Sequence, residues 1–319
     1  MRAIRVRETG GPEVLRLEEL PTPEPGPGEV LVRLEVIGVN YIDTYKRKGL
    51  YPVPLPFTLG EEGAGVVERV GEGVVGVRPG DRVAFANVQG SYAEYQAVPA
   101  ERLVPIPEGL DARLAAALLL QGMTVHYLLE STYPVRAGDQ VLVHAGAGGV
   151  GSLLIQWAKR KGATVYATAS TEEKRAFCRA LGADYALPYE GFAQAVKALS
   201  GGGVDVVYDG VGKETFLGSL EALRPRGMLV LFGQSSGPVP PMDPQVLNRM
   251  GSLFLTRPTL HHYTKDRKEL LWRAGEVFRA AREGGLRVKI GAEFPLERAQ
   301  EAHEALEGRK TVGKVLLLP

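Results

Sequence analysis

Short runs of alternating hydrophobic and polar residues fill the first third of the chain, and Gly and Pro separate them. The alternation predicts β-strands at residues 30–36, 64–70, 81–86 and 92–98. The Pro- and Gly-rich stretch PTPEPGPGE, residues 21–29, is expected to form a rigid loop leading into the first strand. The pattern therefore predicts a compact, strand-rich domain with long loops.

From Asp111 onwards the spacing of hydrophobic residues changes. DARLAAALLLQGMTVHYLLE has helical spacing, and after it short hydrophobic runs alternate with helical patterns. The runs predict strands at 141–143, 164–167, 185–187, 204–208, 228–232 and 252–256. The connections are long enough for crossover helices, so the fold class is expected to be α/β with a doubly wound parallel sheet.

The last sixty residues break this alternation. They predict a helix near 268–283, a strand near 288, a helix near 296–306 and a closing strand at 314–318. Such a tail does not extend a six-stranded doubly wound sheet, so it should return to the first domain. We expect one domain from residues 1–118 and 258–319 and another from 119–257.

A glycine-rich bend, HAGAGGVG, joins the strand at 141–143 to the following helix. Gly146, Gly148 and Gly151 fit the G-x-G-x-x-G pattern, with Gly149 and Val150 between them. The first glycine permits the turn, the second lets a pyrophosphate approach the backbone, and the third lets the helix pack on the strand. This arrangement predicts a dinucleotide site.

The second strand of the sheet ends at Ser170 without the acidic residue that usually binds the ribose of NAD. Ser170 or Thr171 can cap the next helix, and a capping box from Ser170 would use Glu173. Lys174 then falls in the first turn, where a cation suits a 2′-phosphate. NADPH is therefore the expected cofactor; the alternative is that Lys174 belongs to a solvated helix start.

Composition narrows the function classes. The chain has 38 Lys and Arg against 37 Asp and Glu, which argues against nucleic acid or an anionic membrane as partner. No apolar run of membrane-spanning length and no signal-peptide core is evident, so we expect a cytoplasmic protein. Cys178 is the single cysteine and is expected to pack as a small hydrophobe. Twenty-two prolines and three asparagines are typical of a thermophile.

Several motifs occur in a characteristic order: GVNYIDTYKRKGLYP, GEEGAGVV, GDRVA, GAGGVG, GSLFLTRP and TVGKVLLLP. With them the chain resembles the medium-chain dehydrogenase/reductase superfamily and, within it, the zinc-free quinone oxidoreductases that include zeta-crystallin. The resemblance covers essentially the whole length. It implies a GroES-like catalytic domain built from both chain ends, with a Rossmann domain inserted between them.

The chain departs from the zinc-dependent members of this superfamily. Gly60, Glu61 and Glu62 stand where those enzymes have a Gly-His-Glu motif, and Asn40 lies in the stretch that holds their cysteine ligand. No trio of zinc ligands remains, so we expect no metal. We expect structural roles for the histidines, which are His126, His144, His261, His262 and His303.

The resemblance also implies which residues bind cofactor and substrate. Asn40 and Thr124 would position the nicotinamide or its ribose. Tyr45, Tyr51 and Arg257 could bind a quinone oxygen as negative charge develops on it, although both tyrosines could instead serve in packing. The resemblance also assigns cofactor binding to residues at the remaining strand ends, namely Tyr189, Gly212, Phe232, Gly233 and Gln234.

Three function hypotheses stay open. The first is an NADPH-dependent quinone reductase, and the second is a reductase of activated carbon–carbon double bonds in alkenals or enoyl thioesters. The third is an NADPH-binding protein with a structural or RNA-contacting role. We also expect a homodimer formed through the last Rossmann strand, because SLFLT at 252–256 is apolar and an open sheet edge must be covered.

Overall fold

The computed structural model describes all 319 residues and divides into two compact units. One contains Met1–Met123, Thr264–Arg282 and Val288–Pro319, and the other contains Thr124–Tyr263 and Glu283–Arg287. The domain limits at 118 and 258 drawn from the sequence stay a prediction. The two units are described one at a time.

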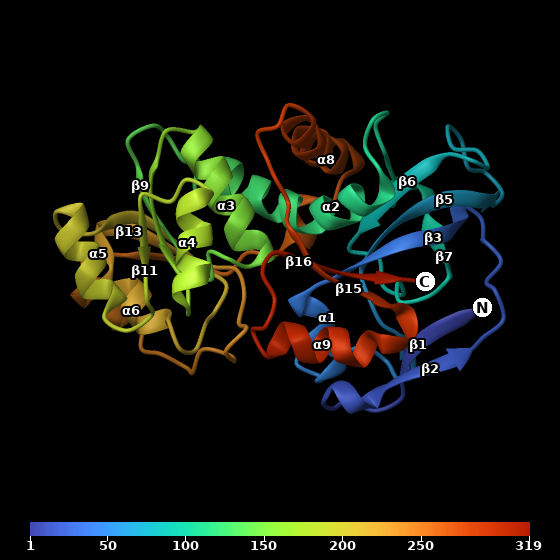
Figure 1. The fold of residues 1–319 in the computed structure, drawn as a ribbon, viewed down its shortest axis with the longest axis horizontal. Helices are drawn as coiled ribbons and strands as arrows, with labels where there is room; N and C mark the ends of the chain where they lie inside the picture. Colours follow the sequence, from blue (N-terminus) through green and yellow to red (C-terminus); the bar gives the residue numbers. More distant parts are fainter. The chain divides into compact units, whose positions relative to one another are not determined.

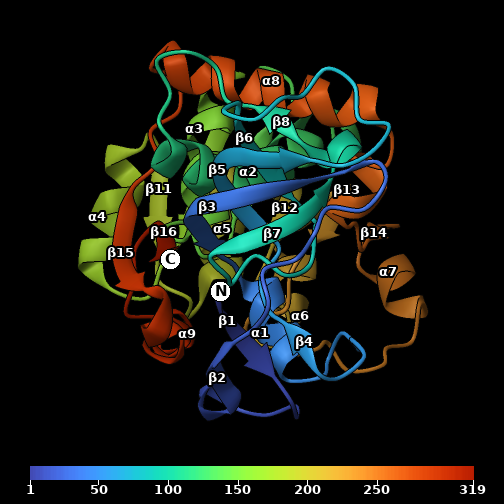
Figure 2. The same cartoon turned by 90° about the vertical axis from the view of Figure 1, so that its right-hand side faces the viewer.

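The first unit is built on a seven-stranded sheet, seen in Figure 2. Its strand order is β15-β16-β3-β5-β6-β8, and β7 also pairs with β3. Only β15 and β16 run parallel; the other pairs are antiparallel. The strands are β3 (Glu29–Val39), β5 (Glu62–Val70), β6 (Arg82–Ala86), β7 (Tyr95–Pro99), β8 (Val104–Pro105), β15 (Ile290–Pro295) and β16 (Lys314–Leu318).

A smaller sheet and several helices complete this unit. The small sheet has the order β2-β1-β4, formed by Leu15–Glu19, Arg2–Val6 and Phe57–Thr58. The helices are α1 (Tyr41–Arg47), α2 (Ala112–Tyr127), α8 (Arg267–Arg282) and α9 (Ala299–Glu307), with short 3₁₀ turns at Pro12–Val14, Ala100–Arg102 and Leu296–Arg298. The chain passes from the first unit to the second within α2.

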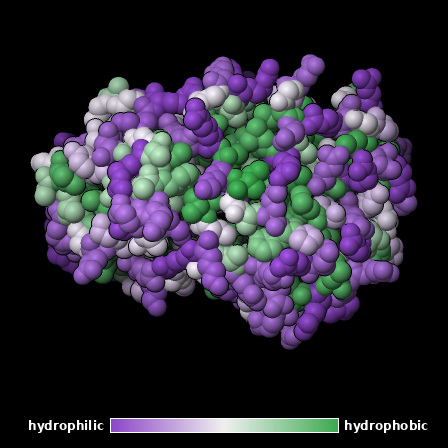
Figure 3. All heavy atoms as spheres, viewed as in Figure 1, coloured by the Kyte–Doolittle hydropathy of each residue, from purple (hydrophilic) through white to green (hydrophobic).

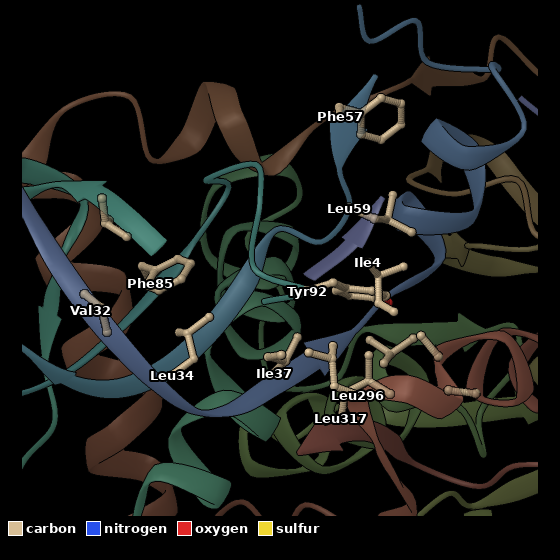
Figure 4. Close-up of a cluster of buried hydrophobic side chains, with 14 of the residues drawn as sticks. Ile4, Val32, Leu34, Ile37, Phe57, Leu59, Phe85, Tyr92, Leu296 and Leu317 are labelled. Atoms are coloured by element: carbon tan, nitrogen blue, oxygen red, sulfur yellow. The ribbon is translucent and has the colours of Figure 1, made fainter. Parts of the chain in front are cut away.

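Hydrophobic side chains from distant segments form the core of the first unit. Figure 4 shows Ile37 of β3 near Leu317 of β16, with Ile4 and Tyr92 beside them. Pairing of β16 with β3 confirms that the tail returns to the first domain, as expected. The strand alternation predicted near residue 30 is also confirmed, because β3 buries its apolar positions and exposes Arg33 and Glu35.

The second unit is a doubly wound sheet in which all six strands are parallel, as predicted. Its order is β11-β10-β9-β12-β13-β14. The strands are β9 (Gln140–Val143), β10 (Thr164–Thr168), β11 (Tyr185–Leu187), β12 (Val204–Asp209), β13 (Leu223–Leu231) and β14 (Phe254–Thr256). The helices are α3 (Gly149–Arg160), α4 (Glu172–Ala180), α5 (Phe192–Ser200), α6 (Phe216–Glu221) and α7 (Gln245–Arg249), and Figure 1 labels α3 to α6. A π-helical turn, Leu128–Thr132, extends α2, and a 3₁₀ turn lies at Leu260–Tyr263.

Several details differ from the sequence predictions. The strand predicted at 228–232 is longer and begins at Leu223, and the strand predicted near 288 lies at Ile290–Pro295. The last Rossmann strand begins at Phe254, because Ser252 has the left-handed φ of +56° and lies in the bend that precedes the strand. The strand predicted at 92–98 begins at Tyr95. The three-stranded sheet and α1 were not predicted, because their hydrophobic patterns are too short to stand out.

One helical segment, Ala112–Thr132, is long and apolar enough to cross a membrane. However, 83% of its most apolar 18-residue stretch is buried within the protein, which is typical of a core helix in a soluble protein. Hydrophilic residues cover most of the face seen in Figure 3. The segment is therefore part of the protein interior.

Candidate functional site

The glycine-rich bend links the end of β9 to the start of α3. Gly148 is the N-cap of α3 and provides no side chain to cap it. The N–H groups of Gly149, Val150 and Gly151 occupy the first helical turn, where no preceding carbonyl can accept from them. Together with the positive end of the helix dipole, these donors fit an anion such as a dinucleotide pyrophosphate.

Two glycines of the bend are required by close packing. A Cβ on Gly146 would lie 2.8 Å from Sγ of Cys178, and one on Gly151 would collide with the carbonyl of Ala145. Cys178 is buried, so its predicted packing role is confirmed. Burial also raises the pKa of its thiol to about 11, which keeps it protonated.

The end of β10 is the place predicted for the 2′-phosphate. Ser170 is exposed there and Lys174 is half-buried. Of the two predicted caps, Thr171 is the N-cap of α4, and its hydroxyl accepts a hydrogen bond from Lys174 N at 3.3 Å. The predicted capping box from Ser170 is wrong, because Ser170 precedes the N-cap. Arg175 donates to Ala169 O at 3.2 Å and to Glu172 at 3.0 Å, so its guanidinium is held by the protein.

The other predicted cofactor residues of the second unit follow strand ends. Tyr189 lies at the glycine bend, where its hydroxyl accepts from Ala145 N at 3.2 Å. The loops after β12 and β13 touch: a Cβ on Gly212 would lie 3.0 Å from Cα of Gln234, and one on Gly233 would lie 2.7 Å from Gly210 O.

Three further candidates belong to this unit. Phe232 directly follows β13, and Thr124 is buried in α2. Arg257 is exposed after β14 and donates to Pro258 O at 3.2 Å. The predicted roles of these residues remain predictions.

In the first unit, α1 and the turn after it carry the predicted substrate tyrosines. The rings of Tyr45 and Tyr51 meet edge to face with centroids 5.4 Å apart. Tyr51 is placed by the backbone, because the carbonyl of Tyr45 accepts from the N–H groups of Leu50 and Tyr51. Tyr45 is buried, whereas Tyr51 is partly exposed.

Asn40 begins α1 and lies in a buried polar network. Its Nδ2 donates to Glu62 Oε2 at 2.9 Å and to Gly38 O at 3.3 Å. Its Oδ1 accepts from Lys314 Nζ at 2.8 Å and from Gln121 Nε2 at 3.4 Å. The amide orientation is fixed, because an ammonium can only donate and a carboxylate can only accept. Protein groups therefore occupy the amide that was predicted to position the nicotinamide.

A second buried network starts at Asp43, which completes a capping box with Asn40. Tyr92 Oη donates to Asp43 Oδ2 at 3.0 Å and lies 3.0 Å from His303 Nε2. Arg47 donates to His303 Nδ1 at 2.7 Å. Burial raises the pKa of Asp43 to about 7, while burial and the nearby Arg47 charge lower the pKa of His303 to about 3.

The structure has no group of three or more His, Cys, Asp or Glu side chains that could hold a metal ion. Glu61, at the position of the zinc-binding histidine in the related enzymes, forms an ion pair with Lys46. Lys46 Nζ also donates to Gln89 at 2.7 Å. His303 does not face solvent on its charged helix; it is buried with Arg47 and Tyr92.

Comparison with known proteins identifies the family of the chain. Residues 26–108 match the model of the alcohol dehydrogenase GroES-like domain, and residues 149–264 match that of the zinc-binding dehydrogenase. The quinone oxidoreductase of Pseudomonas aeruginosa is 46% identical over 315 residues, covering 97% of each chain. The chain belongs to the quinone oxidoreductase family.

Two other relatives bear on the chemistry. A 2-haloacrylate reductase of a Burkholderia species is 43% identical and covers 98% of each chain. The quinone oxidoreductase of Escherichia coli has been solved in complex with NADPH. That structure has a TM-score of 0.98 and 41% sequence identity, with 100% of both chains covered.

The sequence did not reveal the two buried networks. Glu62 and Lys314 are 252 positions apart, so no local pattern connects them. The available signal was a lysine in the otherwise apolar closing strand KVLLL. The N-x-x-D spacing of Asn40 and Asp43 was a second signal, because it marks a helix start.

Proposed function

We propose residue roles for this enzyme, an NADPH-dependent quinone oxidoreductase that works without zinc. NADPH supplies the hydride from nicotinamide C4, and one further proton completes the reduction of a quinone to a hydroquinone. The N–H groups at the start of α3 would bind the pyrophosphate. Ser170 and Lys174 would bind the 2′-phosphate. The observation that carries this assignment is the uncapped start of α3 beside a strand end that lacks an acid.

For the substrate, we assign Tyr45 and Tyr51. A hydroxyl within hydrogen-bonding reach of the quinone oxygen would stabilise the negative charge that builds there after hydride transfer. Arg257 is the third candidate for this role, and Thr124 is assigned to the nicotinamide end. Asn40 would support that end from within its buried network, because its amide is already bonded to protein groups. Tyr189, Gly212, Phe232, Gly233 and Gln234 complete the proposed cofactor site.

A second candidate function is the reduction of an activated carbon–carbon double bond. It is favoured by the 43% identity to a 2-haloacrylate reductase. Hydride addition to such a bond needs the same cofactor and the same stabilisation of charge on a conjugated oxygen. The two candidates therefore differ in the substrate and not in the cofactor site.

The deciding experiment is a screen of NADPH oxidation over quinones, alkenals, 2-haloacrylates and enoyl thioesters. We expect the highest kcat/KM with a quinone. A higher kcat/KM with a double-bond substrate would replace the proposal. Dialysis against a strong chelator should leave the activity unchanged, and zinc-restored activity would contradict the metal-free mechanism.

We infer a homodimer formed through β14. This strand is the edge of the second unit's sheet and exposes Phe254 (56%) and Leu255 (37%). An exposed apolar edge strand favours pairing with a second copy. Light scattering at micromolar concentration should give twice the chain mass, and a monomer mass would refute the inference.

We also propose a cytoplasmic location and the two-domain limits predicted from the sequence. The single buried cysteine suits a reducing compartment. Fractionation of cells would test the location. Limited proteolysis near residues 118 and 258 would test the limits.

A further inference from the structure

His144 follows β9 and begins the glycine-rich bend, and its imidazole is fully buried. Both ring nitrogens have partners. Nδ1 lies 2.8 Å from Thr168 Oγ1, and Nε2 lies 2.9 Å from Ser219 Oγ. Thr168 ends β10, and Ser219 lies on α6. One side chain therefore connects three elements at the carboxyl edge of the sheet.

The direction of each hydrogen bond follows from Asp209, the last residue of β12. Ser219 Oγ donates its proton to Asp209 Oδ2 at 2.8 Å, so it can only accept from His144. His144 Nε2 must therefore carry the proton, and Nδ1 must accept from the Thr168 hydroxyl. Burial lowers the pKa of His144, which favours this neutral form.

These hydrogen bonds form a chain from Thr168 through His144 and Ser219 to Asp209, which we call the relay. Asp209, at one end of the relay, is held by several further contacts. Asp209 Oδ1 accepts from the N–H groups of Val211 and Gly212 at 2.8 and 2.9 Å, and Thr215 Oγ1 donates to the same carboxylate. These contacts hold the loop after β12, which contains Gly212. The relay thus runs from the end of β10 through β9 to the loop after β12.

Thr168, at the other end of the relay, also contacts the glycine-rich bend. Gly146 N donates to Thr168 O at 2.9 Å, so the residue that bonds the imidazole also fixes the bend. The His144 ring lies against Tyr189 with centroids 6.2 Å apart, and the Tyr189 hydroxyl accepts from Ala145 N. Ala145 has φ +51°, a conformation that needs support from its surroundings.

We propose that His144 is a positioning residue for NADPH. Its relay through Thr168, Ser219 and Asp209 sets the spacing between the pyrophosphate donors of the bend and the end of β10, where the 2′-phosphate is proposed to bind. A ligand that spans both places depends on this spacing. A fragment that occupies only the end of β10 does not.

The test removes single hydroxyls from β10 at two places. Thr168→Val deletes the relay hydroxyl while keeping a β-branched shape. Tyr166→Phe is the matched control, because it deletes a hydroxyl of the same strand that donates to Gln140 at 2.8 Å, outside the relay. His144→Phe removes both imidazole contacts. The dissociation constants of NADPH and of adenosine 2′-monophosphate, which lacks the pyrophosphate, are measured by fluorescence and calorimetry, together with kcat at saturating NADPH.

We expect Thr168→Val and His144→Phe to raise the Kd of NADPH about tenfold. The Kd of adenosine 2′-monophosphate should change less than about twofold, and kcat should be retained, because the relay acts on binding and not on the chemical step. Tyr166→Phe should bind both ligands as the wild type does. In the double variant the two effects should not add, since both variants break one relay.

Three results would overturn the proposal. The first is unchanged NADPH binding in folded Thr168→Val, which also decides the matter if His144→Phe does not fold. The second is an equal loss of affinity for NADPH and for the fragment, which would indicate general loosening of the strand end. The third is an equal effect of Tyr166→Phe.

Discussion

Lys314 and Glu62 form an ion pair of 2.6 Å in which both side chains are fully buried. The pair joins the closing strand β16 to the start of β5, and Glu62 Oε1 also accepts from Leu120 N at 2.6 Å. Gly38 makes room for it, because a Cβ there would collide with the Glu62 carboxylate. The pair thereby fixes the amide of Asn40 and the start of α1.

Removing one partner of this pair should destabilise the protein strongly. Lys314→Met leaves the Glu62 carboxylate buried without a cation, which costs about 3 to 5 kcal/mol. The double variant Glu62→Gln, Lys314→Met leaves no buried charge and should recover most of the loss. Free energies of unfolding from urea titrations measure both effects.

A matched control is Lys159→Met, which breaks a more exposed ion pair of 2.8 Å with Asp184. Exposed pairs contribute about 0 to 1 kcal/mol, so this variant should be nearly as stable as the wild type. If Lys314→Met were no less stable than Lys159→Met, the buried pair would have no special role.

Asp43 and His303 should make the free energy of unfolding depend on pH in opposite directions, so each partly cancels the effect of the other. The pKa of Asp43 is raised to about 7, so its contribution is present at low pH and is lost as pH rises towards 7. The pKa of His303 is lowered to about 3, so its contribution is lost as pH falls below the ordinary histidine value. The two slopes oppose each other between about pH 4 and 6.5.

Asp43→Asn should therefore reveal the His303 slope. The variant's free energy of unfolding should rise by about 1.4 kcal/mol per pH unit between pH 5 and 6.5, where the wild type stays flatter. Asp266→Asn is the control, because exposed Asp266 accepts from Lys268 N at the start of α8 and lies outside the buried network of Asp43 and His303. A wild type and an Asp43→Asn variant with parallel pH profiles would contradict the assignment.

The elements that the sequence predicted are those with local signals. The glycine-rich bend lies between a strand and a helix within about twenty residues, so it could be recognised from spacing alone. The closing strand Lys314–Leu318 was predicted with its observed limits because its apolar run is bounded by Gly313. In contrast, the strand predicted from residue 252 begins two residues later, because the left-handed φ of Ser252 depends on the preceding loop.

The buried polar networks could not be predicted in this way. His144, Thr168, Asp209 and Ser219 come together only because the strand order places β9 between β10 and β12. The sequence can indicate the parallel sheet, but it does not state which polar residues meet at the strand ends. Tertiary packing decides that, and it also buries His303 on a helix that carries charged residues.

Tyr45→Phe and Tyr51→Phe test the proposed substrate contacts. Each variant removes one hydroxyl and keeps the ring, and loss of a hydrogen bond to developing charge costs about 1.5 to 3 kcal/mol. We expect kcat/KM for the best quinone to fall roughly ten- to a hundredfold with the Kd of NADPH unchanged. Steady-state kinetics and fluorescence titration measure the two quantities.

Tyr41→Phe is the matched control on the same helix. The Tyr41 hydroxyl donates to Leu306 O at 3.1 Å, so its loss should affect stability slightly and turnover not at all. If Tyr45→Phe and Tyr51→Phe turned over the quinone as well as Tyr41→Phe does, both tyrosines would be packing residues.

Lys174→Ala tests the preference for NADPH over NADH. The lysine is half-buried in the first turn of α4, next to the exposed Ser170, and Arg175 is already held by Glu172 and Ala169. A charge-assisted hydrogen bond to the 2′-phosphate contributes on the order of 1.5 to 3 kcal/mol. The KM for NADPH should therefore rise roughly ten- to a hundredfold.

The change should be confined to one cofactor and one kinetic constant. NADH has no 2′-phosphate, so its KM should stay the same. Saturating kcat with NADPH should also be retained, because the contact is equally strong in the ground and transition states. Lys197→Ala on α5 controls for the loss of a lysine from the second unit. An equal rise in KM for NADPH and NADH would show that Lys174 supports the fold of this strand end and does not recognise the phosphate.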